Sequence, residues 1–235
     1  LARLYFNIMY SQKDEEKYIV EYFKDTPNGK FLDFGGYDPK VFSNTRRLYE
    51  LGWKGIYLEP SKAQYENFIK EYDDDENMTL INKAVSTYDG EITFYNCNDG
   101  PSTTEVSHKE KWLDRIQVWN EEIVPCISIN TLLEKYAHEI DFLNIDVEGA
   151  NIQLFRAIEP KYLRNIKMIC IEHDEYHTEM INSLARYGFQ LILYNEENIL
   201  MVKGSYWTLI NKIKSFYLLS QFRSIGKKKI LKLLM

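Results

Sequence analysis

Short apolar runs alternate with longer segments of helical periodicity along most of this 235-residue chain. The clearest runs are FLDF at 31–34, GIYLE at 55–59, DFLNI at 141–145 and MICIE at 168–172. Runs of this length suit buried strands, and helices between them suit parallel neighbours. We therefore predict an α/β fold with a mostly parallel sheet, formed by one domain with an added segment. Further strands are predicted at 79–86 and 91–96, with a hairpin from FQLILY and ILMVK.

Acidic residues stand at or just after the ends of these runs: Asp33, Glu59, Asp146 and Glu172. In an open α/β sheet, ligands bind at the carboxyl ends of the strands, where the strand order reverses. The four acids are therefore predicted to lie around one ligand site.

The turn after the first strand reads FLDFGGYDPK, and a helix through VFSNTRRLYE is predicted to follow it, capped by Asp38. Two glycines allow a ligand to lie against the backbone. Glu59 follows Gly36 by 23 residues, a spacing that suits an acid binding both ribose hydroxyls. The acidic helix start disfavours a pyrophosphate and suits a cationic nucleoside such as S-adenosylmethionine (SAM). The alternative is that Gly35 and Gly36 form only a tight turn and Glu59 is a solvated strand end.

Four motifs in a fixed order extend this interpretation: SQKDEEKYIVEYF (11–23), FLDFGGYDPKVFSNTRRLYELGWKGIYLEP (31–60), NKAVS (82–86) and IDFLNIDVEGA (140–150). Together they resemble the FkbM-type SAM-dependent methyltransferases over about residues 10–203. The resemblance implies a Rossmann-like class I methyltransferase fold: a seven-stranded, mostly parallel sheet with a reversed last strand and helices on both faces. It also implies methyl transfer to hydroxyls of sugars, glycans or related metabolites, as in polysaccharide biosynthesis.

The resemblance assigns roles to individual residues. Asp33, Gly35 and Gly36 would form the SAM-binding loop, with Glu59 on the ribose. Ala84 and Val85 would flank the adenine, and Ser11 and Gln12 would cap the cofactor from the N-terminal side. Asp38-Pro39 departs from the family's usual glycine, which makes the loop stiffer and more acidic.

Methyl transfer to a hydroxyl requires the acceptor oxygen to be deprotonated and aligned with the sulfonium. Asp146, Glu172 and His173 are the predicted catalytic residues, and two routes stay open for them. They could bind Mg²⁺ or Mn²⁺, in an arrangement similar to that of catechol-type O-methyltransferases. Alternatively, His173 could act as a base without a metal. Glu148 could reach the substrate or cap the next helix, and the capping role is favoured.

Residues 97–122 are polar with scattered tryptophans, and we predict a long active-site loop or lid. Trp112 and Trp119 could stack on a sugar ring or pack within the lid. His108 and His138 show no partner in the pattern and are predicted to lie on the surface.

Charge is distributed unevenly along the chain. Residues 203–235 hold eight Lys and Arg and no acid, so the net charge of −6 leaves −14 on residues 1–202. An acidic body argues against a nucleic-acid partner, and the FkbM resemblance implies a sugar or glycan acceptor as the partner. Three scattered cysteines favour a reducing, cytoplasmic setting.

We divide the chain into a methyltransferase domain at 1–203 and a basic amphipathic segment at 204–235. That segment could lie on the inner face of a membrane, or dock on the acidic body or on the second subunit of a homodimer.

Two other functions remain open at this point. A nucleotide-sugar or dinucleotide enzyme could use a similar sheet, although GxGxxG is missing. A binding module without catalysis could retain SAM affinity alone, although the set of strand-end acids and histidines is intact.

Overall fold

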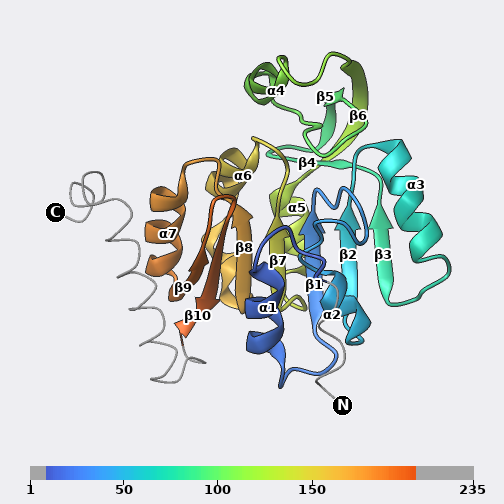
Figure 1. Cartoon of the computed structure of the whole chain (residues 1–235). Helices are drawn as coiled ribbons and strands as arrows, with labels where there is room; N and C mark the ends of the chain where they lie inside the picture. Colours follow the sequence, from blue (N-terminus) through green and yellow to red (C-terminus); the bar gives the residue numbers. More distant parts are fainter. Residues whose placement is uncertain (1–8, 205–235) are drawn as a thin grey trace.

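A seven-stranded sheet between two layers of helices forms the core of the computed structural model, which describes residues 9–204 (Figure 1). The sheet consists of β1 (Lys30–Phe34), β2 (Lys54–Leu58), β3 (Met78–Ile81), β7 (Phe142–Ile145), β8 (Met168–Glu172), β9 (Phe189–Tyr194) and β10 (Asn198–Lys203). The helices beside it are α1 (Glu15–Phe23), α2 (Arg46–Glu50), α3 (Lys62–Glu71), α5 (Ile129–Tyr136), α6 (Asn151–Ala157) and α7 (His177–Arg186), with a 3₁₀ turn η1 (Pro160–Arg164).

The strand order is β3-β2-β1-β7-β8-β10-β9, and β10 runs antiparallel to both of its neighbours. The predicted seven-stranded sheet with a reversed last strand is therefore confirmed. The order reverses at β1, which pairs with β2 on one side and with β7 on the other. Crossovers leave this point in opposite directions, so a crevice opens beyond the carboxyl ends of β1 and β7.

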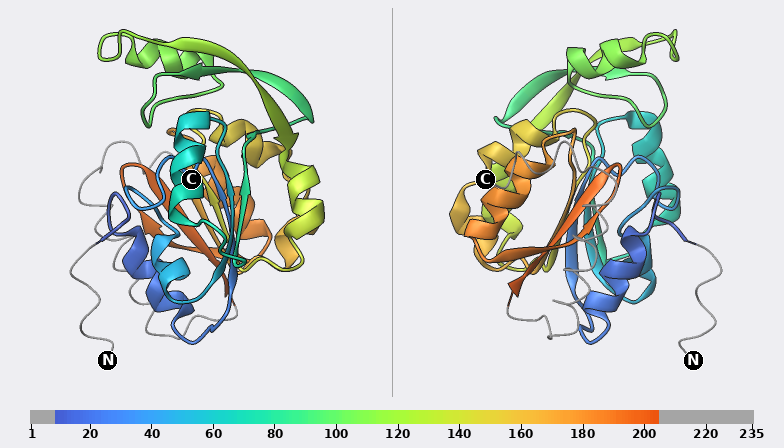
Figure 2. Two further views of the ribbon diagram at one scale, coloured as in Figure 1. Left: turned by 90° about the vertical axis from the view of Figure 1, so that its right-hand side faces the viewer. Right: turned by 60° about the vertical axis from the view of Figure 1, so that its left-hand side comes forward.

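Alternating side chains of the central strands bury both faces of the sheet. Leu32 and Phe34 pack in one cluster with residues of α5, α6 and α7. Phe31 and Tyr57 pack in a second cluster with residues of α1, α2 and α3. The two helical layers lie on opposite sides of the sheet in Figure 2. Because both faces are covered, the strands read as nearly continuous apolar runs.

A second, smaller sheet stands above the carboxyl ends of the main strands (Figure 1). It contains β4 (Ala84–Ser86), β5 (Gly90–Asn96) and β6 (Asn120–Ser128) in the order β4-β6-β5, with α4 (Val106–Trp112) between β5 and β6. We call residues 84–128 the lid. The predicted loop at 97–122 is thus partly wrong, because it contains a helix and the start of a long strand.

The single strand predicted at 79–86 is two strands in two different sheets. Asn82 marks the break between them. Its side-chain amide donates to the backbone oxygens of Glu59 and Pro60, at 2.8 and 3.1 Å. These bonds turn the chain out of the main sheet, so that β4 pairs with β6 instead.

The helix predicted after Asp38 begins only at Arg46. Asp38 Oδ1 accepts from the backbone N–H groups of Lys40 and Val41, both at 2.8 Å, and so closes a turn rather than capping a helix. The Ser-Asn-Thr segment at 43–45 is buried before the helix starts, and its side chains bond inward. These local polar bonds compete with helical ones.

No helix within residues 9–204 is both long and apolar enough to cross a membrane. The basic segment predicted at 204–235 lies outside the described residues apart from Gly204. Its membrane or subunit contacts, the homodimer and the cytoplasmic location stay predictions.

Candidate functional site

A pocket opens between the lid and the carboxyl ends of β1, β2 and β7. Seven of the predicted cofactor-binding residues line it: Gln12, Asp33, Gly35, Gly36, Glu59, Ala84 and Val85. Asp146 and Glu148 line it as well. Ser11 and Asp38 are not among the lining residues. Ser11 instead donates to the Lys13 carbonyl and accepts from the Glu16 N–H, at the start of α1.

Neighbouring protein atoms leave no room for a side chain at Gly35 or Gly36. Gly35 has a φ of +79°, and a Cβ there would lie 1.7 Å from the backbone oxygen of Asp146. A Cβ at Gly36 would lie 2.7 Å from Cζ of Phe68. Gly35 therefore lets the end of β1 approach the loop after β7, and Gly36 leaves room for the Phe68 ring of α3. Ligand access to this backbone follows from that packing.

Glu59 is a buried carboxylate whose direction is fixed by the backbone. Its two oxygens accept from the N–H groups of Tyr37 at 3.1 Å and Ser61 at 2.7 Å. Burial raises the pKa of Glu59 to about 8, against the opposing effect of these two bonds. Each carboxylate oxygen still has a free lone pair, so the group can accept the two hydroxyls of a ribose.

Asp33 is buried in the wall of the pocket, and each of its oxygens accepts one hydrogen bond from the protein. Thr45 Oγ1 donates to one at 2.6 Å, and Asn144 Nδ2 donates to the other at 2.7 Å. Burial raises the pKa of Asp33 to about 6, against these two bonds. Each oxygen keeps a second lone pair and Asp33 lines the pocket, so Asp33 can act on a ligand directly as well as through Thr45 and Asn144.

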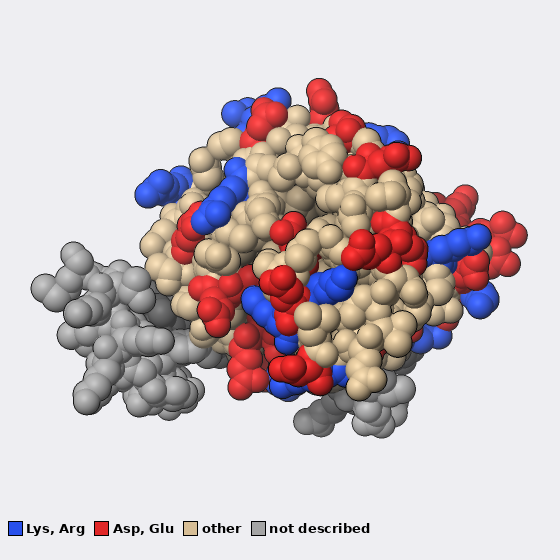
Figure 3. Space-filling view, turned by 90° about the horizontal axis from the view of Figure 1, so that it is seen from above, with Lys and Arg blue, Asp and Glu red and all other residues tan. Residues whose placement is uncertain are grey.

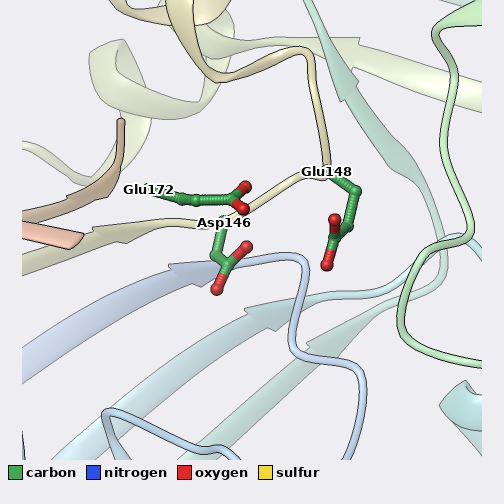
Figure 4. Close-up of side chains that lie close together, drawn as sticks. All are labelled: Asp146, Glu148 and Glu172. Carbon is green, nitrogen blue, oxygen red and sulfur yellow. The ribbon is translucent and has the colours of Figure 1, made fainter. Parts of the chain in front are cut away.

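Three carboxyl groups meet beside this pocket, from the ends of β7 and β8 (Figure 4). Asp146, Glu148 and Glu172 each offer an oxygen, and these atoms all lie within 4.8 Å of one another. Burial raises the pKa of Asp146 and of Glu172 well above the usual range, and repulsion from neighbouring carboxylates adds to the effect. Without a cation, a cluster this close retains protons.

Asn151 at the start of α6 holds Glu172 in place. Its Nδ2 donates to Glu172 Oε2 at 2.6 Å and to Asp174 Oδ2 at 2.9 Å. Its Oδ1 accepts from the Val147 N–H at 2.8 Å. The amide therefore links the loop after β7 to the end of β8.

Glu148 joins the cluster to the lid and does not cap α6, whose N-cap is Ala150. Its φ is +48°, an unusual value for a residue with a side chain. Thr103 Oγ1 donates to its backbone oxygen at 2.6 Å, and His108 Nε2 lies 3.1 Å from its Oε2. The next residue is glycine because a Cβ on Gly149 would lie 2.7 Å from Cβ of His108.

The surface position predicted for His108 is therefore wrong, because this side chain is buried between the lid and the strand ends. His138 is exposed, as predicted. Trp112 Nε1 lies 3.0 Å from His108 Nε2. This nitrogen can accept a hydrogen bond from the indole N–H or, when it carries a proton, donate to Glu148. Trp119 Nε1 donates to the Ile116 backbone oxygen at 3.1 Å. Both indoles bond within the lid, which supports the packed-lid alternative.

The structure does not bring His173 into the carboxylate cluster. Its Nδ1 accepts from the Glu175 N–H at 3.1 Å, and its Nε2 faces the Asn195 backbone oxygen at 3.2 Å. The ring is buried and stacks on Tyr194 at 5.2 Å between centroids. To act as a base or a metal ligand, His173 would have to break one of these bonds. Glu148 takes the third position in the cluster instead.

Sequence reasoning missed a set of buried amides: Asn44, Asn144 and Asn151. Asn144 carried a usable signal, because it is polar in the middle of the apolar run FLNI. Asn44 lies in the FkbM-like motif at 31–60, but nothing there or at Asn151 indicated a buried role, because asparagine is common in turns and at helix starts.

A comparison with protein-family models identifies a methyltransferase domain over the segment that contains most of the site. A family model described as Methyltransferase FkbM domain matches residues 33–191, more than half of the chain. No protein of curated function matches the sequence.

Among solved structures, a candidate tRNA methyltransferase from Streptococcus pneumoniae aligns with a TM-score of 0.46 and 13% identity, covering 92% of this chain and 85% of its own. The same protein in complex with S-adenosyl-L-methionine aligns with a TM-score of 0.41 and 12% identity, covering 91% and 92%.

A candidate rRNA methylase from Clostridium thermocellum aligns with a TM-score of 0.46 and 10% identity, covering 83% of this chain and 98% of its own. A candidate caffeoyl-CoA O-methyltransferase from Staphylococcus aureus aligns with a TM-score of 0.43 and 10% identity, covering 84% of this chain and 86% of its own.

The predicted partners, a sugar or glycan acceptor and no nucleic acid, do not agree with the descriptions of two of these proteins as tRNA and rRNA methylases. The net charge of a whole body does not describe the surface around one pocket. Figure 3 shows acidic and basic side chains interspersed on the face that carries the lid. Both parts of the prediction are withdrawn.

Proposed function

The chain belongs to the FkbM methyltransferase family and is a SAM-dependent methyltransferase, and on this premise we propose that it methylates a hydroxyl oxygen with the help of a divalent cation. The observation that carries the proposal is the convergence of Asp146, Glu148 and Glu172 beside the pocket that Gly35 and Glu59 line. An acceptor bound under the lid would lie between the cofactor and these carboxylates.

The donor set fits a hard cation. Three carboxylates and no sulfur or nitrogen ligand suit Mg²⁺ or Mn²⁺, which prefer oxygen. The raised pKa values of Asp146 and Glu172 also support the proposal, because a cation would relieve the repulsion that burial intensifies. When bound, such a cation would hold the acceptor hydroxyl and lower its pKa.

The chain's own residues would position the two reactants. Glu59 would accept from the ribose hydroxyls, since Tyr37 and Ser61 fix the direction of its carboxylate. The Gly35-Gly36 turn would leave room for the methionine part of SAM. The lid would exclude water, because His108 and Thr103 tie it to Glu148.

The reaction forms a C–O bond as the methyl carbon leaves sulfur, so that the sulfonium becomes the neutral thioether of S-adenosylhomocysteine (SAH). The hydroxyl proton must leave to a nearby base. We place it on a carboxylate of the cluster rather than on His173, whose two ring nitrogens already face backbone groups.

Two measurements test the proposal. Mn²⁺ titration of the full chain, followed by electron paramagnetic resonance, should show one bound ion that Asp146→Asn and Glu172→Gln lose. Lys13→Ala is the control: its exposed side chain pairs with Glu196, neither residue belongs to the cluster or lines the pocket, and the variant should bind Mn²⁺ normally. Absence of a bound ion in the unaltered chain would rule out the proposed metal site.

Incubation with ¹³C-methyl SAM and hydroxyl-bearing small molecules tests the acceptor atom. The ¹³C chemical shift of the transferred methyl distinguishes an oxygen product from a nitrogen product. Transfer to nitrogen alone would rule out the hydroxyl acceptor.

A further inference from the structure

A chain of buried amides fixes the orientation of Asn44, a side chain that lines the cofactor pocket. The Asp33 carboxylate accepts from Asn144 Nδ2 at 2.7 Å, so Asn144 Oδ1 must face the other way. That oxygen accepts from Asn44 Nδ2 at 3.2 Å. Asn44 Oδ1 is therefore the last acceptor in this series of hydrogen bonds.

Asn44 Oδ1 has no hydrogen-bond partner within residues 9–204, although the side chain is only 5% exposed. A flip of the amide would not help, because Nδ2 would then lose Asn144 Oδ1 and also Cys170 Sγ, which lies 3.7 Å away. A buried acceptor without a donor costs about 1–3 kcal/mol. Because Asn44 lines the pocket, a ligand bound there can supply the donor.

The layout of the pocket identifies the part of SAM that would reach this oxygen. Ala84 and Val85 lie at one end of the pocket on β4, and Glu59 follows β2. A nucleoside with its ribose on Glu59 extends its other end across Gly35 toward β7, where Asn144 and Asp146 lie. That end of SAM carries the α-ammonium and the carboxylate of the methionine part.

We propose that Asn44 Oδ1 accepts a hydrogen bond from the α-ammonium of SAM, an inference that rests on SAM binding in this pocket. Asn44 Oδ1 cannot bind the carboxylate, because both groups are acceptors. The buried charge of Asp33 adds to the bond. It polarises the amides of Asn144 and then Asn44, so the terminal oxygen becomes a stronger acceptor for a cation.

The proposal gives the buried charge of Asp33 a path to the ligand through the chain of amides. Asp33 would act on the ammonium through two amides, and Thr45 would hold its other oxygen. Asn44 and Thr45 both belong to the Ser-Asn-Thr segment before α2. The segment would thus form the methionine end of the site.

The test compares two ligands by calorimetry with the full chain. One is SAH, and the other is its deaminated analogue, which keeps the thioether and the carboxylate but has no amino group. The unaltered chain should bind SAH about 10- to 100-fold more tightly, as expected for a hydrogen bond to a charged group. Asn44→Ala should lose this preference and leave affinity for the analogue unchanged.

Asn198→Ala is the matched control, because Asn198 is a buried amide that accepts from Cys170 Sγ at 3.7 Å on the far side of the network from the pocket. It should alter both affinities by the same factor. Equal weakening of both ligands by Asn44→Ala would overturn the proposal, as would equal binding of both ligands by the unaltered chain.

If Asn44→Ala does not fold, the affinities of Asn44→Ser for the same two ligands are measured and judged by the same criterion. Failure of the unaltered chain to bind SAH at all would overturn SAM binding itself and the proposal with it. That result differs from loss of the ligand preference alone.

Discussion

Replacement of Gly35 by alanine should damage the site more than any other single methyl group added to the sheet. The residue has a φ of +79°, and the new Cβ would be placed 1.7 Å from the backbone oxygen of Asp146. Neither group is the end of a flexible side chain. The Gly35 N–H donates to Leu58 O at 3.1 Å, and the Asp146 N–H donates to Phe34 O at 3.0 Å, so both segments are held in the sheet.

The magnitude has two parts. A left-handed conformation costs a residue with a Cβ about 1–2 kcal/mol. Overpacking against groups that cannot move freely costs about 1–3 kcal/mol more. The free energy of unfolding should therefore fall by about 2–5 kcal/mol, a large share of the ~5–15 kcal/mol that holds a typical domain.

Gly52→Ala separates the two parts. Gly52 has a φ of +87°, and a Cβ there would have no atom within 4 Å, so its substitution should cost only the conformational part. Urea unfolding at equal protein concentration measures both variants. Mn²⁺ and SAH titrations should also show weaker binding for Gly35→Ala alone, because the Asp146 segment must shift. Equal losses of stability in the two variants, within ~0.5 kcal/mol, would refute the close-approach argument.

Three further outcomes follow from the structure. The pKa of Glu59 is raised to about 8, so the folded state holds a proton that the unfolded state releases near 4.5. The free energy of unfolding should therefore fall as pH rises from about 4.5 to 8. Glu59→Gln should flatten that slope in urea titrations. His108→Ala removes the lid's contact with the Glu148 side chain, while Thr103 still bonds its backbone, and should lower kcat several-fold with SAH affinity unchanged; a parallel fall in SAH affinity would contradict the lid role. Glu15 is fully buried and accepts from two asparagine amides, so Glu15→Ala should cost about 1–3 kcal/mol in urea unfolding, whereas the exposed Glu21→Ala should cost less than ~0.5 kcal/mol; similar costs would argue against the buried network.

The main sheet could be predicted because its strands are buried on both faces and therefore appear as uninterrupted apolar runs. The lid could not, because β5 and β6 expose one face and α4 is short, which leaves a weak pattern. The break at Asn82 depends on two backbone oxygens of the loop after β2, and no local signal announces it.

Within the site, strand-end acids were predictable because chain position alone sends them to one edge of a parallel sheet. Glu59 and Asp146 are examples. The partners of His173 were not predictable, because the two groups that bond its ring, Glu175 N–H and Asn195 O, are backbone groups. Side-chain chemistry carries no information about such partners.

The sequence by itself determined the strands of the main sheet and their order along the chain, the FkbM resemblance and the acids at the carboxyl edge. These follow from hydrophobic periodicity and from residue types at strand ends, which are local properties. Only the tertiary structure decided that Glu148 rather than His173 completes the carboxylate cluster, and that Asn44 ends a chain of amides with a free oxygen. Both depend on which atoms from distant segments meet in the interior, where each buried donor and acceptor has to be matched.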